Sequence, residues 1–497
     1  MGGALLRSRS VRWWLLLVLL VATVAAAVAW ALQDGPAREA FPAPAVEVTS
    51  DPWYVGANVE LTLRSTIPRS AQVITLTLIA PGTGSPQLEG ISPGLFGLSG
   101  VQVPWLLPEY RGLDVALAAA SGARYIGLDF DWRRIEPQRG RYDWKDTDEV
   151  VALAKQHELQ LVPMLLYTPR WASTASFAPL DSQHAPPADF ADYRDFVYDV
   201  VSRYKPYGAS PITADGYGIT DWAIWNEPNS LQNQAVEGAR SFWTGTSEEY
   251  LLLLRAGYEG ARAADSTCNV LNGAIADIFW AEGEQDLITA LEQLYDPNGD
   301  GDAGDGARPF FDTLNIHTYQ PGPPDENWYE ERLSTIVDVM SRFGDQEKPI
   351  WITETGYGSV AVPAQQSRYL SEELQAEAVG TVYRACSAFP QVERVFWWSL
   401  RDYYVSASAA GGAMEAHHGL LRVNFMPKPA YLAYGRLTGR VGQVLTLTSL
   451  INDESVANVT VPATFMSQPG TYVLFAQLEG AEPATVMTYE ALKYVGE

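Results

Sequence analysis

The sequence predicts an α/β protein whose main part is a closed (β/α)8 TIM barrel, flanked by small β modules. Two observations carry this prediction. Short apolar runs alternate with longer amphipathic stretches over residues 95–439, as in parallel strands joined by helices. There are eight such runs, the number that closes a barrel. They are Leu95–Leu98, Tyr125–Phe130, Leu161–Leu166, Trp222–Trp225, Val270–Ile275, Leu314–His317, Ile350–Thr353 and Val395–Trp398.

An open, doubly wound sheet is the alternative fold for such a pattern. No glycine-rich phosphate loop follows any of the eight runs, which weakens that alternative. The stretch Asp189–Tyr204 illustrates the segments between the runs: its apolar residues recur at helical spacing behind Asp189, a residue type that caps helices. We expect such helices to cover the barrel.

The first 35 residues predict a membrane-targeting segment. Arg7, Arg9 and Arg12 precede Trp13–Leu32, which is apolar except for Thr23. Twenty helical residues span about 30 Å, enough to cross a bilayer with the basic flank in the cytoplasm. A cleaved secretory signal is the alternative, because small residues surround Trp30. Either interpretation predicts an extracytoplasmic protein, anchored to the cell membrane by a single N-terminal helix or secreted.

Residues 36–94 and 440–497 predict the two β modules. A proline-containing linker comes first, and alternating apolar residues then favour strands around Val59–Leu63 and Ile74–Leu78. Strand-like runs return after Gly439, at Val444–Leu447, Val459–Val461, Tyr472–Leu478 and Thr485–Thr488. The two modules could form one β-sandwich beside the barrel, but the sequence leaves that pairing open.

Composition excludes several classes of function. The chain has 34 Lys plus Arg against 59 Asp plus Glu, a net charge of −25, so a nucleic-acid partner is not expected. Cys268 and Cys386 are its two cysteines, too few for a disulfide framework, a cysteine-based zinc site or an iron-sulfur cluster. We expect both to be buried free thiols.

Two of the predicted strands end in an acidic motif. Trp222–Trp225 is followed by Asn226, Glu227 and Pro228, and Ile350–Thr353 is followed by Glu354. These are the fourth and seventh runs, and active sites of such barrels lie at the C-terminal ends of the strands. Two carboxyl groups facing each other across about 5 Å are what a retaining glycosidase needs. Only a closed barrel could bring these two residues together.

The motifs resemble those of glycoside hydrolase clan A, the TIM-barrel superfamily that includes cellulases, β-mannanases and β-xylosidases. The resemblance covers roughly residues 95–439. It is carried by Trp225-Asn226-Glu227-Pro228, Ile352-Thr353-Glu354-Thr355-Gly356, Asp131-Trp132-Arg133-Arg134-Ile135-Glu136-Pro137, Tyr167-Thr168-Pro169-Arg170-Trp171, His317-Thr318-Tyr319, Phe396-Trp397-Trp398-Ser399-Leu400, Gly419-Leu420-Leu421 and Lys428-Pro429-Ala430-Tyr431.

This resemblance implies roles for individual residues. Glu227 would be the general acid and then the base, with its pKa held near neutrality by the other carboxylate, and Glu354 would be the ionised nucleophile. Asn226 would bind the sugar 2-hydroxyl. Tyr319 would orient Glu354, and His317 would line the same wall. Trp397 or Trp398 would form a sugar platform, but only one can point inward if the strand alternates.

The second strand departs from the clan pattern. Gly127 stands where relatives usually have an arginine near the nucleophile, and Asp129 follows on the same face as a candidate substrate-binding residue. Asp129 could instead pair with Arg133 or Arg134. Tyr167 stands where many relatives have histidine. Trp132 and Trp171 are further candidate sugar contacts, with ordinary core packing as the alternative for both.

A metal is not required for this chemistry, but one loop resembles the start of a calcium site. Oxygen ligands recur at alternate positions of residues 296–302, with Gly301 at the sixth, whereas the twelfth position is Ala307. This excludes an EF-hand and leaves a simpler structural calcium loop. Its candidate ligands are Asp296, Asn298, Asp300 and Asp302.

The sequence therefore predicts an exported, retaining glycoside hydrolase that cleaves O-glycosidic bonds of a β-linked oligo- or polysaccharide by double displacement. Two alternatives stay open. One is a carbohydrate-binding surface protein whose barrel has lost catalysis, and the other is a transglycosylase that uses the same residues. The sugar, the linkage, endo or exo action and the oligomeric state are not predicted.

Overall fold

The structure is a computed structural model, and its description covers most of the chain beyond residue 45. The described residues are 46–50, 52–66, 72–86, 91–101, 110–175, 182–229, 242–277, 286–301, 304–360, 370–403, 415–451, 455–479 and 485–491. The predicted membrane-targeting segment lies outside these residues. None of the described helices is both long and apolar enough to span a bilayer, so the membrane anchor stays a prediction.

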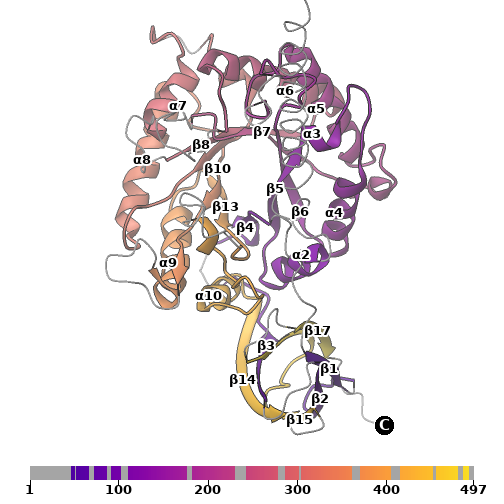
Figure 1. Ribbon diagram of the computed structural model, residues 1–497. Coiled ribbons are helices and arrows are strands. Elements are labelled where there is room, and N and C mark those ends of the chain that lie inside the picture. The colour runs from indigo at the N-terminus through magenta and orange to yellow at the C-terminus, as the bar shows by residue number, and fades with distance from the viewer. Residues whose placement is uncertain are drawn as a thin grey trace, which may run out of the picture. The chain divides into compact units, whose positions relative to one another are not determined.

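Eight parallel strands close into a barrel, as predicted (Figure 1). Each predicted run forms a strand, with ends shifted by a few residues at most. The order around the barrel is β10-β13-β4-β5-β6-β7-β8-β9. The strands are β4 (Phe96–Ser99), β5 (Tyr125–Asp131), β6 (Gln160–Leu166), β7 (Asp221–Asn226), β8 (Asn269–Ala276), β9 (Leu314–His317), β10 (Ile350–Thr355) and β13 (Val392–Trp398).

Helices surround these strands (Figure 1). They are α2 (Arg111–Ala120), α3 (Trp132–Ile135), α4 (Lys145–Gln156), α5 (Phe190–Tyr204), α6 (Ser247–Ala264), α7 (Leu287–Tyr295), α8 (Glu326–Arg342), α9 (Glu372–Ser387) and α10 (Pro429–Leu437). The predicted cap of α5 is present, because the Asp189 carboxylate accepts the backbone N–H of Ala191 at 2.9 Å. Short 3-10 turns are η1 (Pro93–Leu95), η3 (Pro211–Thr213), η4 (Arg308–Phe310) and η5 (Glu415–His417).

Strands from the two ends of the chain share two further sheets. One has the order β1-β2-β15 and the other β14-β3-β16-β17. The alternating residues that predicted strands, such as Leu61 and Leu76, are fully buried in a common apolar core. The N-terminal and C-terminal strands therefore build one β module together. Its strands are β1 (Val46–Ser50), β2 (Val59–Ser65), β3 (Gln72–Pro81), β14 (Val441–Ile451), β15 (Val456–Val461), β16 (Gly470–Leu478) and β17 (Thr485–Ala491).

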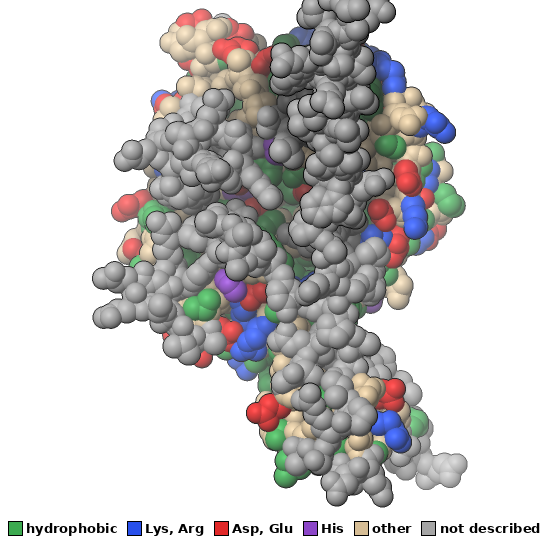
Figure 2. All heavy atoms as spheres, in the orientation of Figure 1, with side chains coloured by type: hydrophobic (Ala, Val, Ile, Leu, Met, Phe, Trp, Pro, Cys, Tyr) green, Lys and Arg blue, Asp and Glu red, His purple; other side chains and the backbone are tan. Residues whose placement is uncertain are grey.

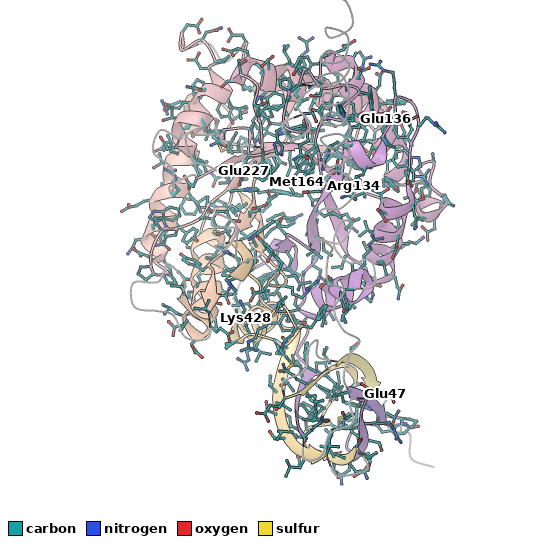
Figure 3. The ribbon with its side chains drawn as sticks, viewed as in Figure 1. Glu47, Arg134, Glu136, Met164, Glu227 and Lys428 are labelled. Atoms are coloured by element: carbon teal, nitrogen blue, oxygen red, sulfur yellow. The ribbon has the colours of Figure 1, made fainter. Side chains whose placement is uncertain are left out.

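A two-stranded parallel sheet, β11 (Ser359–Val360) with β12 (Leu370–Ser371), follows β10. Buried Lys428, labelled in Figure 3, fastens this region to the segment after β13. Its ammonium donates to Asp402 Oδ1 at 2.9 Å and to Ser359 Oγ at 3.2 Å. The loops that follow β10 and β13 are thus held together by one cation.

Cys268 and Cys386 are free and buried, as predicted. Burial raises the pKa of both thiols to about 12. Neither is therefore a reactive thiolate at neutral pH.

Candidate active site

The end of β7 turns Asn226 and Glu227 towards the barrel mouth. Trp225 and Glu227 both have positive φ angles, 76° and 40°, in the left-handed region that side-chain-bearing residues avoid. Trp225 is held in place because its indole donates to the Phe242 carbonyl at 2.8 Å and its ring packs edge-on against Trp243. Strain of this kind is kept where the surroundings fix it, often at functional sites.

Asn226 offers an unused acceptor in this turn. The residue is 5 % exposed, and within the described part of the chain no group donates a hydrogen bond to its Oδ1. A buried acceptor without a donor is costly unless a ligand supplies one. This position suits contact with a sugar hydroxyl, the role that the resemblance implies.

The end of β10 carries Glu354, and a bulge determines its direction. Ile352 pairs with Ile316 of β9, but the next pair is Glu354 with His317, so β10 has one extra residue there. The bulge breaks the strict alternation of the strand. As a result, both Thr353 and Glu354 have side chains in contact with His317.

His317, at the end of β9, connects the two acidic motifs. It is fully buried, and its Nδ1 lies 2.8 Å from Glu227 Oε1 and 3.5 Å from Glu354 Oε2. One oxygen of each carboxylate and one nitrogen of His317 all lie within 4.8 Å of one another. The structure thus brings together two glutamates that are 127 residues apart in the sequence (354 − 227).

This spacing could hold a metal ion, but the hydrogen bonds point to proton transfer. His317 Nδ1 is bonded to Glu227, and the Tyr319 hydroxyl donates to Glu354 Oε2 at 2.8 Å. His317 Nδ1, Glu227 Oε1 and Glu354 Oε2 therefore each have a hydrogen-bond partner within the site. Figure 3 labels Glu227 near the centre of the barrel, and Figure 2 shows apolar (green) and histidine (purple) side chains over the same region.

Burial and neighbouring charges perturb the titration of this group. Burial raises the pKa of Glu354 to about 8; His317 and Tyr319 lower it, whereas the charges of Glu227 and Asp129 raise it. Burial lowers the pKa of His317, but the charges of Glu354 and Glu227 and the bond to Glu227 leave it above its usual value. Glu354 is also the more buried of the two carboxyl groups, with a side chain 9% exposed against 16% for Glu227.

Trp397 and Trp398, at the end of β13, differ in burial, as the alternation of side chains along a strand requires. Trp397 is fully buried, its indole donates to the His418 carbonyl, and its ring lies 6.5 Å from that of Tyr357. Trp397 is therefore wrong as a platform, because no face of its ring is accessible. Trp398 is half-buried, and its ring lies against Gly100, where an added Cβ would come within 2.7 Å. It is the member of the pair that can stack on a sugar.

Asp129 lies on the β5 side of the mouth, beside Met164 of β6 in the strand register. Arg133 and Arg134 form ion pairs with Asp131, the residue that also caps α3, and not with Asp129. Burial and the charge of Asp131 raise the pKa of Asp129 to about 7, against a lowering by Arg133. Gly127, where relatives usually have arginine, lies against Ser99 and Phe396.

Trp132 is wrong as a sugar contact. It is fully buried, stacked on Phe196 at 5.1 Å between ring centres, and its indole donates to Glu136. Trp171 is half-buried, but the Arg139 guanidinium lies 4.8 Å above its ring and its indole donates to the Glu136 carbonyl. Of these two residues, only Trp171 is partly exposed.

The candidate calcium loop follows α7 and is only partly described. The Asp296 carboxylate accepts the backbone N–H groups of Asp300 and Gly301 at 3.1 and 2.8 Å. The Asn298 amide donates to Asp305. Asp302 lies outside the described residues, so the ligand set stays a prediction.

Sequence reasoning missed four residues that belong to the site or to the hydrogen bonds behind it. Asn272 and Asn315 interrupt the apolar runs of β8 and β9, and Thr353 lies within the Glu354 motif. His418 packs edge-on against Tyr319 at 6.0 Å between ring centres. A polar residue inside a buried strand is itself a signal, because its burial is costly without a partner. The adjacent histidines His417 and His418, directly before Gly419, could have indicated His418.

Comparison with known proteins supports a glycoside hydrolase. A family model described as glycosyl hydrolase catalytic core matches residues 306–424, which include His317, Tyr319 and Glu354. A search of curated proteins gave no significant match. This match supports the resemblance to glycoside hydrolases that the motifs carry.

Two solved structures show the same fold. One is a family 39 glycoside hydrolase from the gut symbiont Bacteroides cellulosilyticus WH2, with 15% identity, a TM-score of 0.52, and coverage of 79% of this chain and 82% of that chain. The other is a GH5_18 protein from Streptomyces cattleya in complex with GlcNAc, with 17% identity, a TM-score of 0.51, and coverage of 72% and 80%. At such identities the likeness supports the (β/α)8 fold.

Proposed function

We propose that this protein is a retaining glycoside hydrolase that cleaves a β-linked oligo- or polysaccharide by double displacement. One observation carries the proposal: carboxylate oxygens of Glu227 and Glu354 lie within 4.8 Å of each other at the C-terminal ends of β7 and β10. Retaining glycosidases separate their carboxyl groups by about 5 to 5.5 Å, whereas inverting enzymes leave about 6.5 to 9.5 Å for a water molecule. The separation here favours retention.

In the first step, Glu354 attacks the anomeric carbon and forms a glycosyl ester. The bond to the leaving oxygen breaks, and that oxygen takes the proton of Glu227. Tyr319 keeps one oxygen of Glu354 engaged, so the other is presented to the sugar. A nucleophile whose charge is destabilised by burial gains free energy when the ester neutralises it, which favours the attack.

In the second step, the Glu227 carboxylate takes a proton from water as the water oxygen attacks the anomeric carbon. The ester bond to Glu354 breaks, and both carboxyls return to their starting protonation. His317 Nδ1 lies 2.8 Å from Glu227 Oε1, so it can help to hold the proton that Glu227 recovers from water. A sugar hydroxyl in place of water would give transglycosylation.

The surroundings of the two glutamates suit an uncharged glycone. Trp398 offers a half-buried ring for stacking, and Asn226 offers a buried acceptor for a hydroxyl. Asp129 adds a third carboxyl group, close enough for its charge to raise the pKa of Glu354. A uronic acid or a sulfated sugar would meet like charge at this site.

The test is hydrolysis of a panel of aryl β-glycosides by the full chain, with the first-formed anomer identified by NMR. We expect a retained product and a loss of at least about 10³-fold in kcat for Glu354→Ala. Glu330→Ala, on the exposed face of α8, is the control and is expected to keep full activity.

Azide identifies the two roles. With Glu227→Ala it should restore turnover and give a glycosyl azide of retained configuration, and with Glu354→Ala one of inverted configuration. An inverted hydrolysis product, or undiminished turnover of Glu354→Ala, would contradict the proposal. Bound but uncleaved oligosaccharide with the wild-type chain would indicate a binding protein instead.

A further inference from the structure

A series of hydrogen-bonded, buried side chains behind His317 determines which of its two ring nitrogens carries a proton. The chain begins with Asn272 on β8 and Asn315 on β9, both fully buried. The Asn315 backbone N–H donates to Asn272 Oδ1 at 2.8 Å, and Asn272 Nδ2 donates to the Asn315 carbonyl at 3.0 Å. Because backbone groups have fixed donor and acceptor roles, these bonds determine the orientation of the Asn272 amide.

The same logic orients Asn315. Its Nδ2 donates to the Asn272 carbonyl at 3.2 Å, so its Oδ1 faces the Thr353 hydroxyl at 2.6 Å. An amide oxygen can only accept, and a hydroxyl has a single proton to give. The Thr353 hydroxyl must therefore donate to Asn315.

Thr353 Oγ is then left as an acceptor towards His317. It lies 3.1 Å from Nε2 of the imidazole. Since the hydroxyl proton is already used, this contact is a hydrogen bond only if Nε2 carries a proton. The tautomer of His317 is thus set by Asn272 and Asn315, neither of which touches the two glutamates in the described structure.

The consequence appears at the other ring nitrogen, Nδ1, which faces Glu227 Oε1 at 2.8 Å. With one proton between them, either Nδ1 donates to a carboxylate or a protonated Glu227 donates to Nδ1, and both arrangements keep every bond. Without that proton, one ring nitrogen must point a lone pair at an oxygen, either Nδ1 at Glu227 Oε1 or Nε2 at Thr353 Oγ. Loss of the shared proton is therefore disfavoured.

We propose that Thr353, held by Asn315 and Asn272, is a positioning residue that makes His317 and Glu227 retain the proton delivered to the leaving group. This inference rests on the proposed function for its kinetic consequence. The proton balance is simple: the proton leaves Glu227 for the glycosidic oxygen in the first step and is recovered from water in the second.

Several other charged groups face His317. Glu354 lies 3.5 Å from Nδ1 and is bonded to Tyr319. Asp129, on β5, lies close enough to Glu354 for its charge to raise the pKa of Glu354. Asp277, whose backbone N–H donates to the His317 carbonyl, is neutralised by Arg332. These groups are unchanged when Thr353 is replaced, so the test isolates the hydroxyl.

The kinetic test compares Thr353→Val with Thr353→Ser. The valine removes the acceptor for Nε2–H, so His317 can move its proton to Nδ1 and bond to an ionised Glu227. We expect the basic limb of the kcat/KM profile to move about 0.5 pH unit or more towards acid. The serine keeps the hydroxyl and should restore the wild-type limb.

Thr355→Val is the matched control. Thr355 lies two residues further along β10, is also buried, and contacts Tyr329 instead of His317. Its valine variant should leave the basic limb in place. An unshifted limb in Thr353→Val, or an equal shift in Thr353→Ser, would overturn the proposal.

A second measurement is independent of catalysis and of the Thr353 and Thr355 variants. In the wild-type chain with 15N-labelled histidine, the His317 signals are assigned by their absence in His317→Gln. We expect Nε2 of His317 to be protonated from about pH 5 to about pH 8. An unprotonated Nε2 would overturn the proposal whether or not any glycoside is cleaved. A protonated Nε2 in a chain without glycosidase activity would support the proton assignment and refute only the function.

Discussion

Glu354→Gln should stabilise the protein, and the gain should depend on pH. Burial raises the pKa of Glu354 from its usual 4.5 to about 8 in the folded chain. A carboxyl with a raised folded pKa contributes its full stability below pH 4.5 and loses it as the pH rises to about 8. Glutamine is neutral throughout, so it avoids this loss. The difference between the two pKa values corresponds to about 5 kcal/mol.

We expect about 3 to 5 kcal/mol of this to be measured near pH 8.5, because water entering the mouth screens part of the charge. The assay is the melting temperature of wild type and variant at about pH 4.5 and about pH 8.5. The two should melt together at the lower pH, and the variant should melt several degrees higher at the upper pH, although it is inactive. Glu330→Gln, at an exposed position, is the control. A gap between wild type and Glu354→Gln that is the same at both pH values would refute the reasoning.

Two further variants test other parts of the structure. Lys428→Met should lower the free energy of unfolding by about 3 to 5 kcal/mol, because it leaves the buried Asp402 carboxylate without its cation. Denaturant titration measures this loss, and Lys348→Met, at a more exposed lysine, should lose clearly less free energy. Equal losses in the two variants would contradict this reasoning. In the wild type, KM should fall as the pH rises from about 6 to about 8, because the Asp129 carboxyl, with a pKa of about 7, ionises over this range and then binds sugar hydroxyls better. Asp129→Asn should abolish this pH dependence of KM. A wild-type KM that is constant over that range would contradict this expectation.

The barrel could be predicted because its signal is local. Each strand of a parallel sheet is apolar on both faces, so a run such as Val270–Ile275 is visible in the sequence without any knowledge of its neighbours. The pairing of β2 with β15 could not be predicted in the same way. Both strands alternate equally well, and alternation says which face is buried but not which partner provides the edge.

Part of the candidate site could likewise be predicted from local sequence signals, and part of it could not. Glu227 and Glu354 lie in distinctive motifs at strand ends, and the distance between them follows from barrel closure. From the sequence, Trp132 and Trp397 are candidates for substrate contact as well as for core packing, because a tryptophan has the same chemistry in a core as on a sugar platform. Which of the two applies depends on which residues cover the ring, and here Phe196 and Tyr357 contribute to that cover. The bulge in β10, which turns Thr353 towards His317, likewise has no signature in the sequence.

The position of β3 between β14 and β16 constrains how the chain matures. A ribosome synthesises residues 72–81 early, but both neighbours of that strand are made only after the entire barrel. Until then β3 presents two bare edges with apolar side chains such as Leu76 and Leu78, which are liable to associate with other chains. The late strands β14 and β16 thus cover both edges of the early strand β3. A nascent chain that stalls before residue 441 would remain aggregation-prone even with its barrel complete.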